Sequence, residues 1–148
     1  MTEQEQKIIN LAISILDREL KEHGVSFTSP EVVKDYLRLQ LQDKEREYFG
    51  AMFLNTQNQL IKFEVIHMGS LNSVDVHPRQ VAQFALLNNA NAVILVHNHP
   101  SYSDEPSRAD IVITEHIKKS LELFRINTLD HLIVAGRKVV SLAELGHL

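Results

Sequence analysis

Two histidines one residue apart, His97 and His99, follow the apolar run Ala92–Val96 in a chain of 148 residues. Side chains two positions apart on a strand point to the same side, so both imidazoles can converge on one cation. Ser107 follows eight residues after His99, and Asp110 follows three residues later. With Ser107 as a helix N-cap, the carboxylate of Asp110 lies in the first turn and can face the strand end. The spacing predicts a three-ligand metal site that leaves a fourth position for water, as in catalytic zinc centres.

Four longer segments carry a resemblance to a known family. They read GSLNSVDVHPRQ at 69–80, VILVHNHPS at 93–101, EPSRADIVIT at 105–114 and LDHLIVAG at 129–136. With the spacing above, they resemble the RadC family of JAMM-type metalloprotease-like proteins over about residues 28–148. The resemblance implies an α/β (α+β) three-layer fold, with a JAMM/cytidine-deaminase-like curved mixed sheet flanked by helices. It also implies one zinc ion (Zn²⁺) per chain, held by His97, His99 and Asp110.

The same resemblance implies a zinc metallopeptidase that cleaves a peptide or isopeptide bond in a protein or peptide substrate, using water acidified by the metal. In JAMM proteins a glutamate just before a strand acts as the general base. Glu47 directly precedes the run YFGAMFL and is our choice, with Glu45 as the near alternative. Glu64 lies inside the next expected strand, which favours a solvated or cross-strand role. Ser107 would donate a hydrogen bond to the developing oxyanion.

Two other functions stay open, as does the oligomeric state. A protein-binding module would keep the metal for structure, but such a scaffold needs no water-activating base. A DNA-repair-associated role follows the family name, but the formal net charge of −4 gives no general cationic face for nucleic acid. Full-length RadC proteins also carry a helix-hairpin-helix segment, which does not fit in residues 1–28. Asn98 stands where the deubiquitinating branch has Ser or Thr, and Tyr102 where family members often have glycine.

Local patterns predict the elements that position these residues. Helices are expected over 5–22, 30–41, 78–87 and 108–124. Strands are expected over 48–54, 60–67, 92–96, 129–135 and 138–142, with a further short extended stretch within 68–76. We expect residues 1–28 to form a helical extension and residues 29–148 to form one RadC-type JAMM/MPN domain.

Composition excludes several other classes of protein. An apolar share of 44% with 23% charged residues excludes a disordered chain. The absence of cysteine excludes disulfides and thiolate ligands. No apolar run approaches the ~20 residues that span a bilayer, and the first residues, MTEQEQKIIN, are unlike a signal peptide. We therefore expect a soluble, cytoplasmic protein without a membrane partner.

Overall fold

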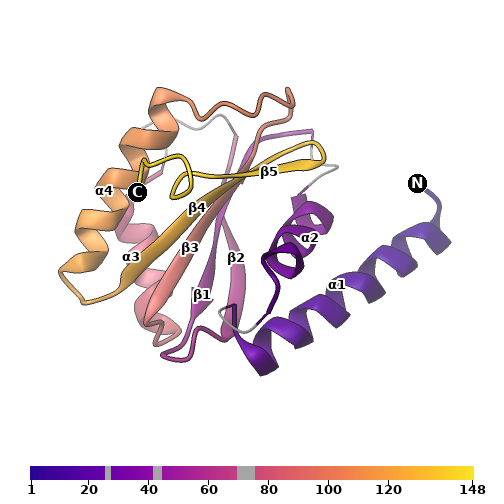
Figure 1. The fold of residues 1–148 in the computed structure, drawn as a ribbon, viewed down its shortest axis with the longest axis horizontal. Helices are drawn as coiled ribbons and strands as arrows, with labels where there is room; N and C mark the ends of the chain where they lie inside the picture. The colour runs from indigo at the N-terminus through magenta and orange to yellow at the C-terminus, as the bar shows by residue number, and fades with distance from the viewer. Residues whose placement is uncertain (26–27, 42–44, 70–75) are drawn as a thin grey trace.

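The computed structural model describes residues 1–25, 28–41, 45–69 and 76–148, which form a mixed sheet with helices packed alongside (Figure 1). The strands of the described residues are β1 (Tyr48–Leu54), β2 (Leu60–Met68), β3 (Ala92–Asn98), β4 (Asn127–Ala135) and β5 (Lys138–Ser141). The helices are α1 (Glu3–His23), α2 (Pro30–Leu41), α3 (Pro78–Leu87) and α4 (Arg108–Glu122). The sheet order is β2-β1-β3-β4-β5. Strands β3 and β4 run parallel, and the other neighbouring pairs are antiparallel.

Helices cover both faces of the sheet, so the predicted three-layer α/β fold is confirmed. Helices α3 and α4 lie on one face, and α2 lies on the other with α1 beyond it (Figure 1). On the first face, Phe53 and Leu95 share a core with Ile117 of α4. On the second face, Met52 shares a core with Tyr36 of α2. Because β1 and β3 are covered from both sides, their sequences are apolar almost throughout.

Helix α1 occupies most of the segment predicted to be a helical extension. Its Leu20 is buried in the core beneath α2, and the hydroxyl of Tyr36 donates a hydrogen bond to Asp17 at 3.1 Å. The division of residues 1–28 from the rest as a separate extension stays a prediction. Within the described residues, no helix combines the length and apolar character needed to cross a bilayer.

The predicted elements agree with the structure except at a few ends. Strand β3 continues past the predicted end because His97 and Asn98 still pair with neighbouring strands. Helix α4 ends at Glu122, two residues earlier than predicted, and β4 begins two residues earlier, at Asn127. The extended stretch predicted within 68–76 falls mainly on residues 70–75, which lie outside the described residues.

Candidate metal centre

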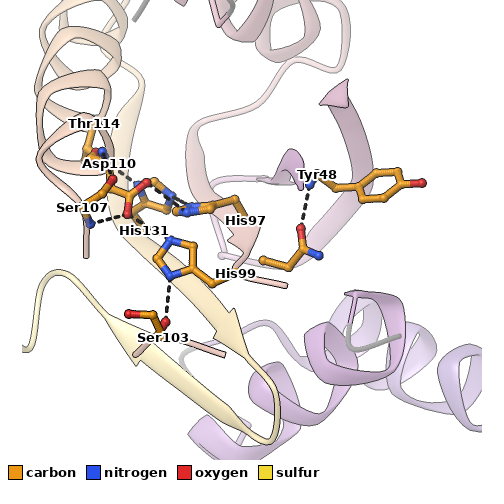
Figure 2. Close-up of polar contacts among 9 residues, drawn as sticks. Tyr48, His97, His99, Ser103, Ser107, Asp110, Thr114 and His131 are labelled. Atoms are coloured by element: carbon orange, nitrogen blue, oxygen red, sulfur yellow. Dashed lines mark hydrogen bonds and ion pairs between the residues drawn. The ribbon is translucent and has the colours of Figure 1, made fainter. Parts of the chain in front are cut away.

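The candidate site lies where the end of β3 meets the beginning of α4 (Figure 2). His97 is a sheet residue that pairs with Phe49 of β1 on one side and with Ile133 of β4 on the other. His99 follows just after β3, and its backbone N–H donates to the carbonyl of Val134 at 2.9 Å. The sheet therefore fixes the backbone of both histidines.

Helix capping positions the acidic member of the site. The hydroxyl of Ser107 accepts a hydrogen bond from the N–H of Asp110 at 3.0 Å. In return, Oδ2 of Asp110 accepts a hydrogen bond from the N–H of Ser107 at 2.6 Å. This capping box confirms Ser107 as the N-cap and holds the carboxylate in one orientation, toward the end of β3.

The structure brings the three predicted ligands into one cluster. Nε2 of His97 lies 3.0 Å from Oδ1 of Asp110, and Nε2 of His99 lies 3.2 Å from Oδ2. One candidate ligand atom from each residue lies within 4.8 Å of the other two. His97 and Asp110 are 1% exposed, whereas the side chain of His99 is 11% exposed. The cluster is therefore closed on the protein side and reaches solvent beside His99.

The hydrogen bonds of the two imidazoles fit a cation in this cluster. Among the described residues, Nε2 of His97 has no hydrogen-bond partner, because Asp110 is close but not aligned for one. Nδ1 of His99 lies 2.8 Å from the carbonyl of Ser103, which can only accept, so Nδ1 carries a proton and the neutral ring has its lone pair on Nε2, 3.2 Å from Oδ2 of Asp110. Metal-binding histidines use this arrangement, with one ring nitrogen donating and the other facing the ion. The donor set of two imidazoles and one carboxylate suits zinc, and it also suits iron, manganese or nickel.

A second polar layer lies behind His97. Nε2 of His131, a fully buried residue of β4, is 2.8 Å from Nδ1 of His97. Nδ1 of His131 is 2.5 Å from the hydroxyl of Thr114, which also lies 2.5 Å from the carbonyl of Asp110 (Figure 2). Burial and the nearby His97 lower the pKa of His131 well below its usual range. Sequence reasoning missed Thr114, although it stands one helical turn after Asp110 and shares its face of α4.

The cluster has a strong preference for positive charge. Burial alone would raise the pKa of Asp110, but contacts with the two imidazoles and with the N–H of Ser107 hold that pKa well below its usual range. Its contact with Asp110 raises the pKa of His99 despite partial burial, and the charge of Glu47 acts in the same direction. A carboxylate that stays ionised beside two imidazoles can bind either protons or a metal cation.

The segment that carries Glu47 is fixed by the residue between the two histidines. Oδ1 of Asn98 accepts a hydrogen bond from the N–H of Tyr48 at 2.6 Å (Figure 2). Its Nδ2 donates to the carbonyl of Arg46 at 3.0 Å. The carbonyl of Glu47 accepts a hydrogen bond from the N–H of Gly69 at 2.8 Å. The backbone on both sides of Glu47 is therefore tied to the end of β3.

Both glutamates that precede β1 line a pocket together with Pro100 and Ser101, which directly follow His99. A pocket of about 360 Å³ is lined by Glu45, Arg46, Glu47, Gly69, Pro100 and Ser101. Glu47 is half-buried and its charge acts on His99, whereas Glu45 is exposed. Glu64 of β2 instead forms an ion pair with Lys62 at 2.6 Å. This arrangement favours Glu47 over the other two as the carboxylate that serves the cluster.

The chain is similar to known proteins over a range of residues that includes the cluster. The RadC-like JAB domain matches residues 27–147. UPF0758 protein YfjY of Escherichia coli (strain K12) is 48% identical over 141 residues, which cover 95% of this chain and 88% of that protein. UPF0758 protein YeeS of the same strain is 47% identical over 146 residues, or 99% of each chain. A UPF0758 protein of Thiobacillus denitrificans is 44% identical over 143 residues, which cover 97% of this chain and 63% of that protein.

Proposed function

This chain belongs to the RadC-like JAB domain family, and from that premise we propose that it is a zinc-dependent hydrolase of the JAMM type that cleaves a peptide or isopeptide bond. The proposal is carried by one observation, the cluster of His97, His99 and Asp110. In it, Nε2 of His97 is buried and has no hydrogen-bond partner among the described residues. Zinc bound there would supply a water that ionises near neutral pH and would polarise the substrate carbonyl.

Glu47 is the proposed general base and acid. A carboxylate in this position takes a proton from the attacking water and returns it to the leaving nitrogen, so the proton balance closes within one turnover. Its half-buried position, the effect of its charge on His99 and the hydrogen bonds of Asn98 to both neighbouring residues support this role. Asn98 limits how far the Glu47 backbone moves from the histidines, and it therefore helps to position the base.

Ser107 is the proposed donor to the oxyanion. Its hydroxyl accepts the N–H of Asp110, and a hydroxyl that accepts one hydrogen bond still has its own proton to donate. Ser107 is exposed, so a substrate carbonyl can approach it from solvent. A donor of this kind contributes about 10²–10³ in rate when it is aimed at the developing negative charge.

A paired comparison of glutamate variants tests the reaction. Zinc-loaded wild-type protein, Glu47→Gln and the control Glu45→Gln are each incubated with a cell-derived protein mixture, and newly formed amino groups are identified by mass spectrometry. We expect the wild type and Glu45→Gln to produce the same cleavages and Glu47→Gln to produce none. Each protein is expected to retain one zinc per chain.

The outcomes separate the parts of the proposal. Cleavage by Glu47→Gln at the wild-type rate would remove Glu47 as the base, and cleavage lost in Glu45→Gln alone would transfer the role to Glu45. A wild-type protein that binds zinc but produces no new amino groups would favour a metal site that serves structure or protein binding. Full zinc stoichiometry in alanine variants of His97, His99 and Asp110 would refute the ligand assignment.

A further inference from the structure

Two buried polar side chains next to the cluster have no role in the reaction proposed above. His131 has no exposed surface, and Thr114 is 1% exposed. We propose that this pair fixes the tautomer of His97 and thereby sets the zinc affinity of the centre. The inference rests on the proposed metal site, and it assigns His131 and Thr114 as positioning residues that do not touch the ion.

The proton positions follow from the carbonyl at the end of the hydrogen-bond chain. The carbonyl of Asp110 can only accept, so the hydroxyl proton of Thr114 points to it at 2.5 Å. The oxygen of Thr114 must then accept the Nδ1 proton of His131 at 2.5 Å. Neutral His131 has its lone pair on Nε2, which accepts the Nδ1 proton of His97 at 2.8 Å. The lone pair of His97 is consequently on Nε2, facing the cluster.

The surroundings keep this chain of bonds from rearranging. His131 packs edge-on against Phe49, with ring centroids 5.6 Å apart, and its backbone is held in β4 between β3 and β5. Thr114 is held on α4, whose capping box also orients Asp110. This chain of hydrogen bonds therefore begins at one proposed ligand, His97, and ends on the backbone carbonyl of another, Asp110.

The hydrogen bonds through His131 and Thr114 oppose a competing tautomer of His97. Asp110 Oδ1 lies 3.0 Å from Nε2 of His97, so the carboxylate attracts a proton to the nitrogen that a metal would use. A proton on Nε2 excludes a metal ion, because the ion needs the lone pair of that nitrogen. By accepting the proton of His97 at Nδ1, His131 favours the tautomer that is ready to bind metal.

Replacing Thr114 by valine tests this chain of hydrogen bonds, because the side-chain volume changes little while the hydroxyl is lost. In Thr114→Val, Nδ1 of His131 loses its acceptor, so His131 can place its proton on Nε2 and reverse the bond to His97. We expect zinc affinity to fall about 10–100-fold, the usual effect of removing a partner behind a metal ligand. Thr114→Ser restores the hydroxyl and is expected to restore the affinity.

Thr128 provides a matched control. It is also a buried threonine, but its hydroxyl has no hydrogen-bond partner in the part of the chain that the structure describes. It pairs with Val93 near the start of β3, whereas His97 lies four residues further along that strand, roughly 13 Å away at ~3.3 Å per residue. Thr128→Val is therefore expected to leave zinc affinity unchanged.

Three measurements decide the outcome. Zinc affinity is measured by competition with a chromogenic chelator. The tautomer of His97 is determined by ¹H–¹⁵N NMR of the imidazole rings without metal. The free energy of unfolding is measured in EDTA. We expect weaker zinc binding and Nε2 protonation of His97 in Thr114→Val alone. If the wild type binds zinc and both valine variants have equal affinity, the role of Thr114 and His131 is overturned while the metal centre stands. If the wild type binds no zinc, the proposed function fails together with this inference.

Discussion

Replacing Asp110 by Asn is expected to abolish stabilisation by zinc while leaving the metal-free fold nearly intact. Asparagine has the same shape, and its carbonyl can accept the N–H of Ser107 in place of Oδ2, so α4 stays capped. Its Nδ2 then takes the place of Oδ1 and can donate to Nε2 of His97, which lies 3.0 Å from that position. The variant therefore removes the anionic ligand without leaving a cavity.

The size of the effect follows from the contacts of Asp110. The variant loses charge-assisted hydrogen bonds worth about 1.5–3 kcal/mol and a helix-dipole contribution of about 0.3–1 kcal/mol. It also removes the cost of burying a carboxylate that is 1% exposed, which is several kcal/mol. Because these effects oppose each other, the free energy of unfolding measured without metal is expected to change by no more than about 1–2 kcal/mol. If the proposed site binds zinc, zinc at 1,000 times its Kd would stabilise the wild type by about 4 kcal/mol.

The assay is thermal unfolding with and without zinc. For a protein of this size about 1 kcal/mol corresponds to roughly 2–4 °C, so 4 kcal/mol predicts an increase in Tm of about 8–16 °C for the wild type. The increase is expected to vanish in Asp110→Asn. Asp104→Asn is the control, because Asp104 is an exposed carboxylate paired with Lys138 and is expected to keep the full increase. An equal increase in wild type and Asp110→Asn would refute the ligand role of Asp110.

Three further results are expected. Without metal, the free energy of unfolding should fall as pH rises above about 6.5. Contact with Asp110 raises the pKa of His99 in the folded protein, so protonated His99 stabilises the fold at pH values below its unfolded-state pKa. This stabilisation is lost as pH rises through the folded-state pKa. Urea unfolding in EDTA at several pH values measures this effect, which Asp110→Asn should remove. Gly50→Ala should destabilise the protein by about 1–3 kcal/mol, because its Cβ would lie 2.5 Å from the carbonyl oxygen of Glu64; chemical unfolding would detect no change if β2 moves freely. Ser107→Ala should cost about 0.5–2 kcal/mol of unfolding free energy through the lost cap, and Ser107→Thr should recover most of it.

Local spacing was enough to predict which residues gather in the cluster. His97 and His99 belong to one strand end, and Ser107 and Asp110 to one helical turn, so the geometry of a single element relates the members of each pair. The meeting of the two pairs was predicted from the place of Asp110 in the first helical turn, where its carboxylate can face the strand end, and the family resemblance implied the same three ligands. The individual strands and helices were predictable from their apolar patterns, whereas their three-layer arrangement was implied by the family resemblance.

The partners behind His97 could not be predicted in the same way. His131 and Thr114 lie 17 residues apart on β4 and α4, and their contact depends on how that helix packs on the sheet. As single residues, a buried histidine and a helical threonine are compatible with many structures. Asn98 is similar, since its bonds to the segment before β1 bridge 50 and 52 positions of sequence. Long-range polar contacts therefore required the structure.

The cluster is built on elements that hydrogen bonds within the protein hold in place. Sheet pairing holds His97, a capping box orients Asp110, and a backbone carbonyl holds His99. Nε2 of His97 is nevertheless buried without a hydrogen-bond partner in the described chain, and such a group costs about 1–3 kcal/mol when nothing satisfies it. Zinc binding would therefore relieve a local cost in a folded protein, in contrast to zinc fingers, which fold only with their metal. Chelation is expected to lower the Tm of this protein but to leave its circular dichroism at 25 °C unchanged.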